Sequence, residues 1–285
     1  MIKNLVLSAG GIGGLSFIGA LNKLQEAKYL NINEIECFCG VSIGSLVSLL
    51  LIINFSIDEC IELATRIDFK DVVSINAVDA LSFFNNYGFD KGVRMNYVIE
   101  LLLSKKNFKK DITLKELYTL TKKKIIIVAV CLETREPVYF DYINYPDYPL
   151  VKCIRASMAI PFLYQPVKIN NQTFVDGGVI KSFPIELFKK EKDTTFGLDI
   201  GAKDRYFSND TDNIPDILNN FKEYILHIFY LPSCYSYKIP KGMKYIKIDI
   251  PGDCLQIHNT TELRKKYVKC GYSKAEEYLK NLSNK

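Results

Sequence analysis

The chain has 285 residues, of which 48% are hydrophobic and 24% charged, so it is long and apolar enough to bury a full core. Its formal net charge of +5 arises from 37 basic and 32 acidic residues, a balance that gives no indication of nucleic-acid binding. The longest apolar run, at 46–53, is far shorter than the ~20 residues that span a bilayer, so we expect no transmembrane segment. We expect a single domain over 1–285, in which 5–190 hold the core motifs and 191–285 complete the fold.

The eight cysteines form no CxxC pair, and the two histidines, His227 and His258, do not accompany them at zinc spacing. We therefore expect reduced thiols in an intracellular, reducing compartment, and no metal or other cofactor. Lys3 before an apolar stretch resembles the start of a signal peptide, but the glycines at 10–14 interrupt the stretch where a hydrophobic helix should continue. A strand followed by a glycine loop is the better interpretation, and it predicts a cytoplasmic or peripheral membrane protein.

The chain opens with two turns that lead from a strand into a helix. Residues 2–7 form a short, mostly apolar run, residues 8–14 are rich in glycine, and leucine and isoleucine then recur at helical spacing from Leu15 to Leu24. Residues 32–39 predict a second strand, and a sharp turn at 40–44 leads into a buried helix at 46–53.

The rest of the chain continues the alternation of strands and helices. This pattern predicts an α/β fold, a three-layer α/β/α sandwich with a mainly parallel central sheet. Residues 58–103 depart from it, with helical stretches and aromatic residues (Phe83, Phe84, Tyr87, Phe89), and we expect them to cap the site. The further elements we predict are strands at 125–130, 137–142, 173–175, 196–200 and 245–250, helices at 152–158 and 262–282, and a polar mobile loop at 203–213.

The segment Gly40-Val41-Ser42-Ile43-Gly44 has the GxSxG pattern of a nucleophile elbow. A serine on a tight turn between strand and helix has a strained backbone, and side chains two positions away on either side would collide with it. The helix that follows points its positive end at the hydroxyl. A glycine pair in a buried turn is the alternative, but the position between a strand and an apolar helix favours Ser42 as a nucleophile.

The earlier glycine loop, Gly10-Gly11-Ile12-Gly13-Gly14, has two possible chemical uses. Backbone N–H groups at a strand-to-helix turn converge on an anion, so the loop could form an oxyanion hole from Gly10, Gly11 and Ile12. A dinucleotide loop is the competing use, but the spacing only approximates GxGxxG. The oxyanion interpretation explains both turns together, whereas a loop that needs glycine only for close packing is the plain alternative.

An activated serine needs a base, and three residues are candidates. Asp176 ends a short strand and precedes Gly177 and Gly178, so a turn directs its carboxylate. His227 lies in an apolar helical stretch, where packing is the simpler role, and His258 lies in a loop and could complete a serine, aspartate and histidine triad. An aspartate would have to be buried beside the serine for its pKa to rise enough for the base role.

In combination these motifs resemble the patatin family, which includes patatin-like phospholipases of plants, bacteria, animals and viruses. The resemblance covers the glycine loop from Ala9 to Gly14, the elbow from Gly40 to Gly44, the Asp176-Gly177-Gly178 motif and the stretch at 156–161. It implies a Ser42–Asp176 dyad without histidine, no metal requirement, and cleavage of acyl esters in a lipid substrate at a membrane surface. A viral protein that acts in a host cell would fit this family.

Two residues depart from the family pattern. Ala9 stands where the first glycine is usual, and Gly13 stands where Arg or Lys is usual, so a charge beside the oxyanion loop is missing. Two other functions therefore stay open: an esterase with a Ser42–His258 triad, and a decayed lipid- or nucleotide-binding module. The lysine clusters at 105–110 and 122–124 would suit anionic lipid headgroups, or would simply be solvated faces.

Overall fold

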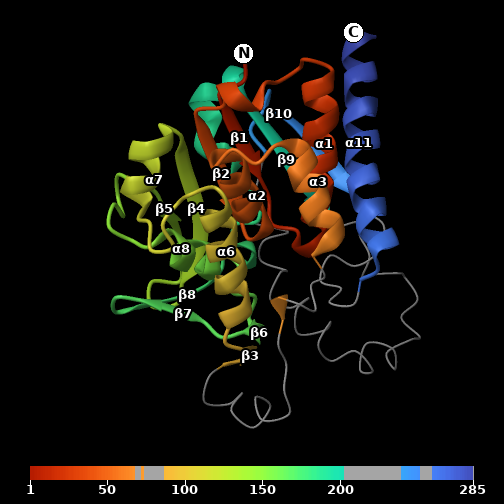
Figure 1. The fold of residues 1–285 in the computed structure, drawn as a ribbon. Coiled ribbons are helices and arrows are strands. Elements are labelled where there is room, and N and C mark those ends of the chain that lie inside the picture. The colour runs from red at the N-terminus through yellow and green to blue at the C-terminus, as the bar shows by residue number, and fades with distance from the viewer. Residues whose placement is uncertain (68–71, 74–86, 202–238, 251–258, 285) are drawn as a thin grey trace, which may run out of the picture.

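The structure is a computed structural model that describes residues 1–67, 72–73, 87–201, 239–250 and 259–284 (Figure 1). In the first half of the chain the elements are β1 (Asn4–Leu7), η1 (Gly11–Gly14), α1 (Leu15–Glu26), η2 (Ile32–Glu34), β2 (Cys37–Val41), α2 (Ile43–Ile52), α3 (Ile57–Arg66), β3 (Gly88–Asp90), α6 (Val93–Lys105), α7 (Leu114–Thr121), β4 (Lys124–Cys131) and β5 (Glu136–Phe140). In the second half they are α8 (Leu150–Ser157), β6 (Phe162–Tyr164), β7 (Val167–Ile169), β8 (Gln172–Asp176), η3 (Gly177–Val179), η4 (Ile185–Thr194), β9 (Thr195–Gly201), β10 (Lys244–Asp249) and α11 (Thr261–Ser283).

Within the described residues, one large sheet has the strand order β10-β9-β1-β2-β4-β8-β7, and β5 also pairs with β4. The five strands from β10 to β4 are parallel to their neighbours in this order. The pairs β4–β5, β4–β8 and β7–β8 are antiparallel. The predicted parallel core is thus confirmed, and an antiparallel part extends it on the β4 side.

The side chains of the central strands alternate between two apolar layers. Leu5, Phe38 and Ile127 belong to a large core cluster with α1, α2, α8 and α11, whereas Val6 and Val128 belong to a smaller one with Phe183, Ile185 and Phe188 on the other face. The long helices therefore cover one face and the 3-10 segment η4 lies on the other, which gives the predicted three-layer α/β/α arrangement (Figure 1). No helix in the described part of the chain is long and apolar enough to cross a membrane.

Most predicted elements are confirmed within two or three residues, but the strand predicted at 32–39 is wrong in its first half. The alternation of apolar and polar residues there imitates a strand. Instead, the Asn31 side chain accepts a hydrogen bond of 3.1 Å from the N–H of Asn33 and starts the 3-10 turn η2. The strand β2 begins only at Cys37. Phe83, Phe84 and the predicted loop at 203–213 lie outside the described residues.

Helices α1 and α11 cross at a pair of glycines. A methyl group on Gly19 would overlap the carbonyl oxygen of Val268, and one on Gly271 would overlap the carbonyl oxygen of Ser16. The two backbones touch at these positions, so the last helix is held against the first by close contact that no larger residue permits.

We expect Gly271→Ala to destabilise the protein by about 1–3 kcal/mol, because the new methyl group must push two packed helices apart. Urea unfolding followed by circular dichroism measures the change. Ser273→Ala is the matched control, since Ser273 is exposed on the same helix, and its effect should stay within about 0.5 kcal/mol. Equal stability of the Gly271→Ala variant and the parent would show that the helices are not in close contact.

Candidate active site

Ser42 occupies the turn between β2 and α2, as the GxSxG pattern predicts. Its backbone has φ 53° and ψ −126°, a strained conformation for a residue with a side chain. The residue is 4% exposed and directly precedes the first turn of α2, where backbone N–H groups lack partners within the helix. The fold therefore holds the Ser42 hydroxyl in a buried position at the positive end of a helix.

The two glycines of the elbow are required by close approach of the backbone. A Cβ atom at Gly40 would lie 2.5 Å from the carbonyl group of Gly44. A Cβ atom at Gly44 would lie 2.6 Å from the carbonyl oxygen of Ser8, so α2 begins against the end of β1. Both positions exclude any other residue, which explains the pattern around Ser42 physically.

The register of three adjacent strands brings Asp176 to Ser42. Val41, the last residue of β2, is level with Val128 on β4, and Ala129, the next residue of β4, pairs with Asp176. Because β8 runs antiparallel to β4, its last residue lies beside the point where β2 ends. The Ser42 Oγ donates a hydrogen bond of 2.7 Å to Asp176 Oδ2.

Asp176 is fully buried, and burial raises its pKa to about 7, although the hydrogen bonds from Ser42 and Gly178 oppose the rise. The N–H of Gly178 donates a hydrogen bond of 2.7 Å to Oδ1, so one carboxylate oxygen is held by the turn and the other faces the serine. A Cβ atom at Gly177 would overlap the carbonyl oxygen of Val128, so this position too requires glycine. A carboxylate with a pKa near neutrality is suited to accept a proton from a hydroxyl.

Ser157, the last residue of α8, links the elbow to strand β4 through two hydrogen bonds. Its Oγ accepts a hydrogen bond of 2.8 Å from the N–H of Ser42 and donates one of 2.6 Å to the carbonyl oxygen of Val128. In the sequence, this residue stands out only as part of the stretch at 156–161. Its signal was a serine in an apolar helix, a buried hydroxyl that must find partners.

The glycine loop lies beside the elbow. A Cβ atom at Gly14 would lie 2.7 Å from Cγ1 of Ile43, the residue that follows Ser42. Gly11 and Ile12 open the turn η1, where the first N–H groups have no acceptor within the turn. The N–H of Ala9 already donates a hydrogen bond of 2.9 Å to the carbonyl oxygen of Ser182, so it is not available to bind an anion.

Isoleucine side chains line the other side of the loop. A Cβ atom at Gly10 would lie 2.5 Å from Cγ1 of Ile200, and one at Gly13 would lie 2.5 Å from Cδ1 of Ile250. The space that a basic side chain at position 13 would enter is therefore filled by Ile250. The missing charge is replaced by apolar packing.

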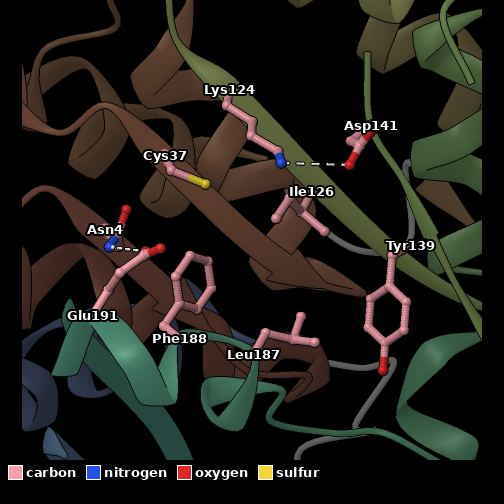
Figure 2. Close-up of a pocket in the computed structure, with 9 residues that line it drawn as sticks. All are labelled: Asn4, Cys37, Lys124, Ile126, Tyr139, Asp141, Leu187, Phe188 and Glu191. Atoms are coloured by element: carbon pink, nitrogen blue, oxygen red, sulfur yellow. Dashed lines mark hydrogen bonds and ion pairs between the residues drawn. The ribbon is translucent and has the colours of Figure 1, made fainter. Parts of the chain in front are cut away.

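A cavity of about 440 Å³ lies at the opposite end of the sheet, where the central strands begin (Figure 2). Asn4, Cys37 and Lys124, which are the first residues of their strands, contribute to its wall. Figure 2 shows the Lys124–Asp141 ion pair of 3.5 Å at one side of this cavity. The cavity is thus separated from Ser42 by the length of β2 and is not part of the same site.

Two of the sequence candidates cannot be placed beside Ser42. His227 and His258 both lie outside the described residues. Among the described residues, the side chain in direct hydrogen-bond contact with Ser42 Oγ is that of Asp176.

We expect Ser157→Ala to destabilise the protein by about 1–3 kcal/mol, because the buried N–H of Ser42 and the carbonyl oxygen of Val128 each lose a partner. Thermal unfolding measures the change. Ser48→Ala is the matched control: Ser48 is also a buried helical serine, but its Oγ has no hydrogen-bond partner among the described residues, so its loss should be neutral or stabilising. Equal effects of the two substitutions would contradict this role of Ser157.

Comparison with known proteins identifies the family and the fold. The chain is 28% identical over 291 residues to the uncharacterized protein R571 of Acanthamoeba polyphaga mimivirus, and this alignment covers 99% of the chain and 95% of R571. It is 30% identical over 185 residues to the probable lipid hydrolase 463L of Invertebrate iridescent virus 6, and this alignment covers 65% of the chain and 62% of 463L. The crystal structure of VipD from Legionella pneumophila matches its fold with a TM-score of 0.61 at 16% identity, over 98% of this chain and 67% of that one. A sequence model of the family described as patatin-like phospholipase matches residues 5–189, and the chain therefore belongs to the patatin-like phospholipase family.

Proposed function

We propose that this protein hydrolyses fatty-acyl ester bonds of lipids, with phospholipid as the substrate we expect first. Ser42 is the nucleophile and Asp176 is its base. The observation that carries the proposal is the buried hydrogen bond of 2.7 Å from Ser42 Oγ to Asp176 Oδ2. Membership of the patatin-like phospholipase family supports lipid as the class of substrate.

The reaction follows from the positions of these groups. Ser42 Oγ attacks the ester carbonyl carbon while its proton passes to Asp176, and a tetrahedral intermediate with a negative oxygen forms. The N–H groups of Gly10, Gly11 and Ile12 are the donors we propose for this oxygen. Asp176 then gives the proton to the departing alcohol. In the second half, Asp176 takes a proton from a water molecule whose oxygen attacks the acyl carbon; the bond from this carbon to Ser42 Oγ then breaks, Asp176 returns the proton to Oγ, and the fatty acid leaves.

The raised pKa of Asp176 matters to both halves of the reaction. An aspartate with an ordinary pKa near 3.9 would be a weak base for a hydroxyl and a poor source of a proton for the alcohol. With a pKa of about 7, the same carboxyl group can take up and give back a proton near neutral pH. Burial by the protein, rather than a histidine, thus prepares the dyad.

Without a basic side chain at position 13, the oxyanion would depend on backbone donors and on the α2 terminus. The Ile250 side chain lies against Gly13 and would limit the access of water to this side of the loop. Exclusion of water strengthens each remaining hydrogen bond to a developing negative charge. This supports an active loop over the decayed lipid- or nucleotide-binding module, because the nucleophile and its base are both present and in contact.

The rate of covalent labelling by a fluorophosphonate tests the dyad. We expect Ser42→Ala to abolish labelling, and Asp176→Asn to slow it by about 10²-fold or more because the amide cannot accept the proton. Ser48→Ala should label normally, since Ser48 is buried in the same helix away from the base. Normal labelling of the Ser42→Ala variant would end the proposal, and a loss of activity in His258→Ala as large as in Ser42→Ala would favour the triad instead.

The pH dependence of kcat/KM for a soluble short-chain ester tests the role of Asp176. The base must be ionised to accept the proton, so kcat/KM should fall about tenfold per pH unit below pH 7 and reach a plateau above it. A base with an ordinary aspartate pKa would instead keep the rate constant down to about pH 5. A profile that stays flat between pH 5 and 8 would therefore contradict the assignment.

A further inference from the structure

Helix α6 presents an apolar stripe on its outer surface. Val93, Tyr97 and Leu101 recur four residues apart, so they share one face of the helix, and they are 66%, 60% and 53% exposed. Single exposed apolar residues are common on soluble proteins, but three large ones in a row on one helix mark an interaction surface.

The opposite face of α6 is fixed in the core. Met95, Ile99 and Leu103 are buried there. The helix start is also held, because Asp90 Oδ1 accepts a hydrogen bond of 2.6 Å from the N–H of Gly92. The stripe therefore cannot turn inward without loss of these contacts.

The charge around the stripe identifies the kind of surface that it fits. Residues 91–110 contain six basic residues and one acidic residue, whereas the rest of the chain contains 31 of each, so this segment alone accounts for the net charge of +5. Of the two aspartates that border it, Asp90 is buried and Asp111 is exposed. Lys91, Lys105, Lys109 and Lys110 are exposed at the two ends of the helix. An apolar stripe between lysines is typical of a helix that lies in the headgroup region of an anionic bilayer.

The start of α6 lies at the catalytic end of the molecule. Strand β3, which leads into α6, pairs with β6, and the segment just before β6 contacts the base, because the carbonyl oxygen of Ala159 accepts a hydrogen bond of 2.9 Å from the N–H of Asp176. Figure 1 shows β3 and the start of α6 toward the end of the sheet where β1 and β2 finish. We infer that the exposed face of α6 docks this protein on anionic phospholipid membranes and so brings the Ser42 site to the bilayer.

This inference rests on the proposed function only for the lipid nature of the substrate, and its test does not require turnover. Sedimentation with vesicles of 70% phosphatidylcholine and 30% phosphatidylserine is measured for the full chain carrying Ser42→Ala, so that lipid stays intact. In this background, Val93→Gln, Tyr97→Gln and Leu101→Gln together should weaken vesicle binding by about tenfold or more. Leu120→Gln is the matched control, because Leu120 is 67% exposed on α7, and it should bind as the parent does.

A second variant set tests the charges. Reversal of Lys105, Lys109 and Lys110 to Glu should weaken binding by about tenfold or more, and added salt should weaken parent binding likewise. Reversal of Lys265, Lys266 and Lys269, which are exposed on α11, is the matched control with the same change in net charge and should leave most of the binding intact.

The outcomes distinguish this inference from the proposed function. When either set of substitutions is made in the chain that retains Ser42, hydrolysis of a soluble short-chain ester should be unchanged. Loss of vesicle binding by variants that retain this hydrolysis supports docking through α6. Equal vesicle binding by parent and α6 variants, or no binding by the parent, would overturn the inference even if the enzyme is active. Light scattering without lipid tests whether the face binds a second copy of the chain instead. A parent that is a dimer, together with a glutamine variant that is a monomer, would assign the face to that contact and would also overturn the inference.

Discussion

The hydrogen bond between Ser42 and Asp176 is the contact on which the proposed chemistry of this protein depends. Removal of a carboxylate from water is costly, and this cost raises the pKa of Asp176 to about 7. The same burial thus destabilises the protein with Asp176 ionised and, in the proposed reaction, prepares this residue as the base. Among the residues that the structure describes, two donors, the Ser42 hydroxyl and the Gly178 N–H, compensate the charge, so little opposes transfer of a proton to it. A strained serine and a poorly compensated carboxylate are tolerated because the surrounding sheet fixes both.

That sheet positions the pair through register rather than through neighbouring sequence. Ser42 and Asp176 are separated by 134 residues, and β4 lies between the strands that carry them. Val128 serves both sides, because its carbonyl oxygen accepts from Ser157 under the elbow and also closes the space beside Gly177. A shift of one residue in either strand pairing would turn one of the two side chains away from the other.

The glycine motifs could be predicted from the sequence, because glycine is needed wherever two stretches of backbone are in close contact. Gly40, Gly44 and Gly177 carry this signal, and they located the two residues that we propose as nucleophile and base. Three features could not be predicted. The antiparallel direction of β8 depends on which strand it joins, the role of Ser157 depends on a contact 115 residues away, and the filling of space at Gly13 by Ile250 depends on a distant strand end. The assignment of the oxyanion donors stays a prediction.

Trapping of the acyl enzyme tests the central claim most directly. The protein is mixed with phospholipid vesicles, quenched in acid within the first turnovers, digested and analysed by mass spectrometry. Our account predicts a fatty-acyl group esterified to Ser42, with free fatty acid as the later product, and no such adduct in the Ser42→Ala variant. Release of fatty acid by the Ser42→Ala variant at the parent rate, or an acyl group on a different residue, would contradict it.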